Sequence, residues 1–97
     1  MAPWRIVLLE VLPAYQLKVQ FVDGVEGVVD LAEFIASDRS GTVFEGFENE
    51  DFFKKAYLNY GAVTWPGEID LAPDAMHKEI ICGGGMYRVP PIQQKAA

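Results

Sequence analysis

The chain has 97 residues, 51% of them hydrophobic and 23% charged, which predicts one globular domain and excludes a wholly disordered chain. Its formal net charge of −6 argues against direct nucleic-acid binding, and no apolar run approaches the roughly 20 residues of a membrane span. The single cysteine, Cys82, excludes an intrachain disulfide and fits a reducing, cytoplasmic setting.

The first part of the chain predicts three β-strands. Residues 5–12 are aliphatic and β-branched, as in a strand buried on at least one face, and Pro13 ends this strand. Between residues 15 and 21 apolar and polar side chains alternate, which places the apolar ones on one sheet face. Asp23-Gly24 predicts a two-residue hairpin turn in which both residues adopt positive φ, with residues 25–29 as the antiparallel partner.

Two short helices are expected next. Asp30 and Glu33 have the spacing of a capping box, so a helix should begin at Asp30. Residues 37–42 have the composition of a turn, in which Gly41 would let the chain reverse. Asn49 predicts the N-cap of the second helix. The apolar anchors of this region are Leu31, Phe34, Ile35, Val43, Phe44, Phe47, Phe52 and Phe53.

A second hairpin is predicted in the second half of the chain. Residues 57–59 and 62–65 read as strands around a turn at Tyr60-Gly61, and Pro66 ends the later strand because it cannot donate to a ladder.

The final predicted element is a helix from Pro73 to Ile81. Proline suits the first helical position, and Asp74 complements the helix dipole in the first turn. The glycines at 83–85 should end this helix, and we expect residues 83–97 to be a Gly-rich linker with a flexible or partner-ordered tail. These elements predict an α+β fold over residues 1–82, with a small antiparallel sheet of about five strands, short helices and a C-terminal helix.

Several stretches carry a resemblance to a known family. They are LKVQFVDG at 17–24, VVDL at 28–31, the spaced phenylalanines between 43 and 53, and above all VTWPGEIDLAPD at 63–74. Through them the chain resembles a small bacterial family of uncharacterised proteins, domain of unknown function 2442, over roughly residues 5–80. Family members often have a small residue where Glu68 or Ile69 stands here, and a Leu-Tyr pair where Met76-His77 stands.

The resemblance implies a compact α+β module, free-standing or joined to a helix-turn-helix DNA-binding domain. Relatives are often encoded beside another small protein, which suggests a regulatory pair of toxin–antitoxin type. The family has no established catalytic residues, so the resemblance assigns none to this chain.

Four polar residues form a candidate metal or acid–base site. Asp74 and His77 are three positions apart on the predicted helix, so both could reach one ion, and Glu68 or Asp70 might add ligands. In the structural alternative, Asp70 binds backbone N–H groups at the start of the helix, Asp74 complements the helix dipole, and His77 is a surface residue. The spacing matches no known metalloenzyme signature, which favours the structural interpretation.

Aromatic residues supply the candidate interaction surface. Tyr57, Tyr60 and Trp65 are expected at a sheet edge or on an exposed sheet face, where they could anchor a protein partner. For Trp65 the alternative is burial at the end of its strand. The rest of the family motif, Pro66, Gly67, Asp70, Pro73 and Asp74, is interpreted as turn and helix-start structure.

These observations favour a non-enzymatic protein-interaction or regulatory module with no cofactor, which binds a protein partner or forms a homodimer through a sheet edge. One alternative is a small metal-assisted enzyme using Asp70, Asp74 and His77. Another is a DNA-binding accessory protein.

Overall fold

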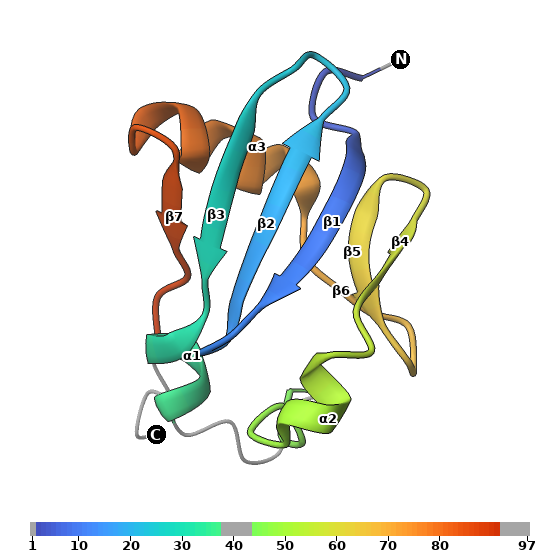
Figure 1. The fold of residues 1–97 in the computed structure, drawn as a ribbon, viewed down its shortest axis with the longest axis vertical. Helices are drawn as coiled ribbons and strands as arrows, with labels where there is room; N and C mark the ends of the chain where they lie inside the picture. Colours follow the sequence, from blue (N-terminus) through green and yellow to red (C-terminus); the bar gives the residue numbers. More distant parts are fainter. Residues whose placement is uncertain (1, 38–43, 92–97) are drawn as a thin grey trace, which may run out of the picture.

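Two β-sheets and three helices form the part of the chain that the computed structural model describes, residues 2–37 and 44–91. The larger sheet has the strand order β1-β2-β3-β7 and the smaller one has the order β4-β5-β6 (Figure 1). All strand pairs are antiparallel except β3 with β7, which is parallel. The α+β class with a mainly antiparallel sheet arrangement is therefore confirmed. In chain order the elements are β1 (Ile6–Leu12), β2 (Gln16–Phe21), β3 (Glu26–Asp30), α1 (Ala32–Ala36), α2 (Glu50–Phe53), β4 (Tyr57–Asn59), β5 (Ala62–Trp65), β6 (Ile69–Asp70), α3 (Pro73–Cys82) and β7 (Met86–Arg88).

One part of the core lies between one face of the larger sheet and α3, which crosses that face in Figure 1, and the core continues to Phe47, Phe53, Val63 and Trp65 around α2 and the smaller sheet. The alternation in β2 buries Leu17, Val19 and Phe21, as the sequence predicts, because successive side chains of a strand point to opposite faces. Met76 and Ile80 lie one helical turn apart on α3 and are also buried. Burial of apolar side chains from both elements is the main force that holds the helix on the sheet.

The turn between β2 and β3 differs from the predicted one. Phe21 pairs with Val25, so the loop has three residues, Val22 to Gly24, and of these only Gly24 has positive φ, at 91°. A three-residue loop with glycine in the left-handed position is the other common hairpin connection. A two-residue turn with both residues at positive φ occurs instead at Tyr60 (51°) and Gly61 (79°), between β4 and β5.

The helix start predicted at Asp30 is wrong, whereas the later helix begins at Pro73 as predicted. The helix α1 begins at Ala32 with Leu31 as its N-cap residue, and Asp30 remains in β3 and accepts a hydrogen bond from the Ala32 N–H. Asp70 lies in β6, and the N-cap of α3 is Ala72, which has no side-chain cap. By contrast, Asn49 caps α2 as expected: its side-chain oxygen accepts from the N–H groups of Asp51 and Phe52.

The segment after α3 is not simply a linker and tail, because it returns to the larger sheet as β7. Gly84 and Gly85 have positive φ and reverse the chain, and the Gly85 carbonyl accepts from the Val28 N–H. Beyond β7, Val89 is 9% exposed and donates to the Asp30 carbonyl. This strand has only three residues and a partner far away in the sequence, so no local periodicity marks it. The predicted turn residue Gly41, the predicted anchor Val43 and the last part of the tail lie outside the described residues.

The chain has a radius of gyration of 13.2 Å, close to the roughly 13 Å expected for a folded domain of about 100 residues. Across residues 2–37 and 44–91, no helix is long and apolar enough to cross a membrane.

Candidate functional site

The predicted metal or acid–base site is dispersed over separate elements. Glu68 is exposed in the turn after β5, Asp70 is exposed in β6, and Asp74 and His77 lie on α3. Within residues 2–37 and 44–91, no group of three or more His, Cys, Asp or Glu side chains is placed to hold a metal ion. The described residues therefore contain no group of ligands for the metal ion that the metal-assisted mechanism requires.

His77 instead has a partner that is distant in the sequence. Its Nε2 lies 2.8 Å from Oδ2 of Asp23, in the turn between β2 and β3. This hydrogen bond, together with one from the Val25 N–H to Asp23, lowers the pKa of the Asp23 carboxyl below its ordinary value. The His77 ring also packs edge-on against Phe21, with ring centroids 4.8 Å apart. The pair thus joins α3 to a hairpin turn, a contact that the 54 residues between its members hide from sequence analysis.

Trp65 is not a surface anchor, because its side chain is fully buried. Its Nε1–H donates a 2.9 Å hydrogen bond to the Phe53 carbonyl oxygen, which satisfies the one polar atom of the indole. The ring packs against Phe47 and Phe53, with centroids 4.8 and 5.7 Å away. The structure therefore selects the core alternative for this residue, and Trp65 joins α2 to the smaller sheet.

The remainder of the family motif surrounds Trp65 with turns and a helix start. Pro66 follows β5, and Gly67 takes a φ of 95° in the loop that leads to β6. Pro73 is the first residue of α3 and Asp74 lies in its first turn, as predicted. The motif thus places a short third strand, β6, between the second hairpin and α3.

The two tyrosines of the candidate surface are exposed. Tyr57 on β4 is 45% exposed, and Tyr60 in the following turn is 87% exposed. The left-handed turn at Tyr60-Gly61 carries the Tyr60 ring away from the core. Gly61 is needed there because a Cβ at this position would lie 2.4 Å from Cγ of Arg5.

Further exposed apolar residues lie near Tyr60, around the start of β1. The Ile6 N–H donates to the Gly61 carbonyl, and the Val22 N–H donates to the Arg5 carbonyl. These bonds hold the start of β1, the β2–β3 turn and the β4–β5 turn together at one end of the molecule, the upper end in Figure 1. We call the exposed apolar residues of these segments the upper surface: Trp4, Val7, Leu8, Val22 and Tyr60.

The sequence does not reveal most of the upper surface, because residues 5–12 predict a strand without a bulge. The β1–β2 register shifts between Ile6 and Leu8, which places an extra residue, Val7, in the strand. Leu8 then pairs with Gln20 and is 61% exposed, whereas Leu9 pairs with the buried Val19. The sequence shows the apolar residues, and the bulge decides which of them reach the surface.

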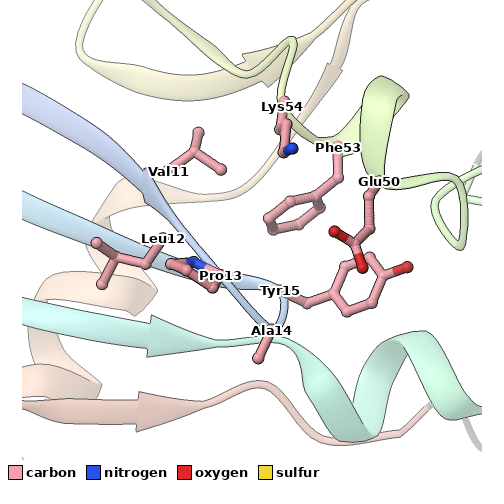
Figure 2. Close-up of a pocket in the computed structure, with 8 residues that line it drawn as sticks. All are labelled: Val11, Leu12, Pro13, Ala14, Tyr15, Glu50, Phe53 and Lys54. Carbon is pink, nitrogen blue, oxygen red and sulfur yellow. The ribbon is translucent and has the colours of Figure 1, made fainter.

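A cavity of about 170 Å³ lies at the other end of β1. Figure 2 shows it between the end of β1 and α2, with the Val11 side chain on the side of the strand that faces Phe53 and Lys54. We call this cavity the β1–α2 groove. Its lining residues are Val11, Leu12, Pro13, Ala14, Tyr15, Glu50, Phe53 and Lys54.

Comparison with known proteins gives one relationship. A family model described as protein of unknown function (DUF2442) matches residues 6–81. No curated protein and no solved structure matches the chain.

Proposed function

The chain belongs to DUF2442, a family of unknown function, and we propose that it is a non-enzymatic module that acts through protein–protein contact. The observation that carries this proposal is the upper surface. It gathers two aromatic and three aliphatic side chains at one end of the fold, each at least 41% exposed. Scattered exposed apolar residues are ordinary, but a group of them rimmed by polar residues is typical of an interaction site.

Aromatic residues give the upper surface the composition of an interface. Tyrosine and tryptophan are enriched among the residues that contribute most to protein–protein affinity. Tyr60 and Trp4 would be the anchors of such an interface, and Leu8 and Val22 would contribute apolar area. A partner that covers these side chains would remove apolar surface from water, which favours binding.

The type of partner is part of the proposal. We propose a small protein encoded beside this one, which would make the two a regulatory pair, or a second copy of the chain. A role as a DNA-binding accessory would follow if the partner binds DNA, because the net charge of −6 disfavours direct contact with phosphate. The metal-assisted alternative has no observation in its favour among the described residues.

The test is binding of the purified full chain to the purified product of the neighbouring gene, measured by calorimetry. Tyr60→Ala should weaken binding by about 10-fold or more if Tyr60 is an anchor. Ile81→Ala is the matched control, since Ile81 is 56% exposed on α3 and outside the upper surface. If the chain is strictly monomeric and does not bind the neighbouring protein, or if both variants bind equally well, the proposal is wrong.

A further inference from the structure

β1 is an edge strand of the larger sheet, and among the described residues no strand pairs with the outer edge of its second half. The other edge strands of the described residues are short: β4 and β7 have three residues each and β6 has two, whereas β1 has seven. The smaller sheet approaches β1 at its start, where the Ile6 N–H bonds to Gly61. Proteins normally protect a long edge with prolines, charges or a covering segment. Residues 8–12 are L-L-E-V-L, with Glu10 as the only charge.

The β1–α2 groove lies beside this open half. Val11 and Leu12 form its strand side, and Phe53 of α2 and Lys54, which follows α2, form the opposite side (Figure 2). Its volume of about 170 Å³ is below the roughly 300–1,000 Å³ of small-molecule sites, so it suits an aliphatic side chain better than a whole metabolite. A strand placed beside β1 would point every second side chain toward this groove.

The groove is held in shape by Tyr15. Ala14 and Tyr15 both have positive φ, at 61° and 59°, a conformation that is unfavourable for residues other than glycine. Tyr15 is fixed by three contacts: its hydroxyl donates to the Glu48 carbonyl, its own carbonyl accepts from Leu31, and its ring packs edge-on against Phe53 at 5.2 Å. A groove that is formed before binding loses less entropy when a ligand enters.

We propose that the second half of β1 binds an extended, positively charged segment of another protein, which pairs with the strand edge and places an apolar side chain in the β1–α2 groove. In such a segment, residues that alternate with the apolar ones face the side of β1 that carries Glu10, because Glu10 and Val11 point to opposite faces. Lysine or arginine at those positions would meet the Glu10 carboxylate from the free edge of β1, while Lys18 of β2 lies opposite Glu10 on its other side. The net charge of −6 also attracts a basic segment over longer distances.

Charge also argues against a second copy as the occupant of this edge. Two copies that pair antiparallel over residues 8–12 about a twofold axis place Glu10 opposite the Glu10 of the other copy. Like charges directly opposite each other destabilise a strand pair. Each copy also carries a net charge of −6, so the copies repel each other. A basic extended segment avoids both penalties.

The probe for this proposal is a capped synthetic peptide of about six residues, an ordinary strand length, that alternates valine and lysine. Its binding to the full chain is measured from the backbone amide shifts in an NMR titration. We expect shifts that are confined to residues 8–12 and α2 and that weaken as salt is added. A peptide that alternates valine and glutamate should bind more weakly, because it places carboxylates beside Glu10.

Two controls separate strand pairing from general attraction. The first is the same valine–lysine peptide with alternate backbone nitrogens methylated, which keeps the side chains and removes N–H donors. The second is a pair of protein variants: Glu10→Gln should weaken binding about two- to five-fold, and Lys54→Gln should not weaken it. If the peptide shifts no β1 amide, or if the methylated peptide binds equally well, the proposal is overturned. Concentration-dependent dimerisation through the β1 amides would also overturn it, in favour of a second copy.

This site goes beyond the proposed function and can fail independently of it. Tyr60→Ala removes an anchor of the upper surface and should leave peptide binding at the β1–α2 groove unchanged. Glu10→Gln should leave binding of the neighbouring gene product unchanged if that protein contacts only the upper surface. If the wild-type chain binds the neighbouring gene product but not the peptide, only this inference is overturned, and the reverse result overturns only the proposed function.

Discussion

At the scale of single residues, the structure gives the aromatic and titratable side chains roles that their sequence positions do not show. Trp65 stands in a motif that suggested an exposed contact, and it is a core residue whose indole N–H bonds to Phe53. His77 stood beside candidate metal ligands, and it bonds to Asp23. In both cases the deciding partner comes from another element, so local spacing could not reveal it.

Replacement of Trp65 tests its structural role. Trp65→Phe removes the N–H donor to the Phe53 carbonyl and part of the ring volume, and it should lower the free energy of unfolding by about 1–3 kcal/mol. Denaturant unfolding of the purified variant measures this change. Tyr60→Ala is the comparison at an exposed aromatic, where we expect a change within about 0.5 kcal/mol. Equal effects of the two substitutions would contradict the burial of Trp65.

The contact between Asp23 and His77 predicts a dependence of stability on pH. Because folding lowers the pKa of Asp23, its carboxylate stabilises the folded state above the unfolded pKa, near 3.8, and this contribution is lost as the pH falls through the folded value. In Asp23→Asn the amide oxygen can still accept from the Val25 N–H, but the carboxylate is absent. The variant should therefore be less stable than the wild type at pH 6 and should approach it in stability at acidic pH, as followed by urea unfolding. A stability difference that does not change with pH would rule out this role for Asp23.

At the scale of elements, Gly27 lets α3 and the segment that leads into β7 lie close to the backbone of β3. A Cβ at Gly27 would lie 2.6 Å from Cγ2 of Ile80 and 2.8 Å from the Gly85 carbonyl oxygen. A side chain on β3 at this position would therefore push α3 and the β7 segment away from the sheet. Glycine at position 27 is a requirement of the tertiary fold that the β-strand propensities of its neighbours do not indicate.

Gly27→Ala should destabilise the protein by about 1–3 kcal/mol, because the added methyl group overpacks the contact of β3 with α3. Hydrogen exchange should show the loss of protection concentrated in β7 and the end of α3. Gly46→Ala is the matched control, since a Cβ there meets no atom within 4 Å. If the two variants have the same stability, the close approach at Gly27 does not exist.

At the scale of the whole molecule, β7 decides where the domain ends. The sequence predicts a domain over residues 1–82, yet β7 pairs with β3 and Val89 is buried beyond it. A chain that ends at residue 82 would expose the edge of β3 and part of the core. A chain that ends at residue 91 would keep both β7 and Val89.

We therefore expect the chain of residues 1–82 to unfold at a lower temperature than the chain of residues 1–91. For a domain of this size each kcal/mol lost lowers the melting temperature by about 4–8 °C, and loss of the buried Val89 and of three residues of pairing should cost more than 1 kcal/mol. Calorimetry of the two truncated chains, with the full chain as the reference, measures the difference. Equal melting temperatures of the two truncated chains would show that the folded domain ends at residue 82, as the sequence predicts.

Much of the α+β fold was determined by local sequence signals. The alternation in β2, the turn glycines, the Asn49 cap and Pro73 at the start of α3 each act over a few residues, so each was predictable from the sequence. The tertiary structure alone decided the bulge in β1, the short strands β6 and β7, the buried place of Trp65 and the contact of His77 with Asp23. The physical reason is that these features depend on contacts between residues far apart in the chain, whose free energy exists only once the sheets and α3 are packed together.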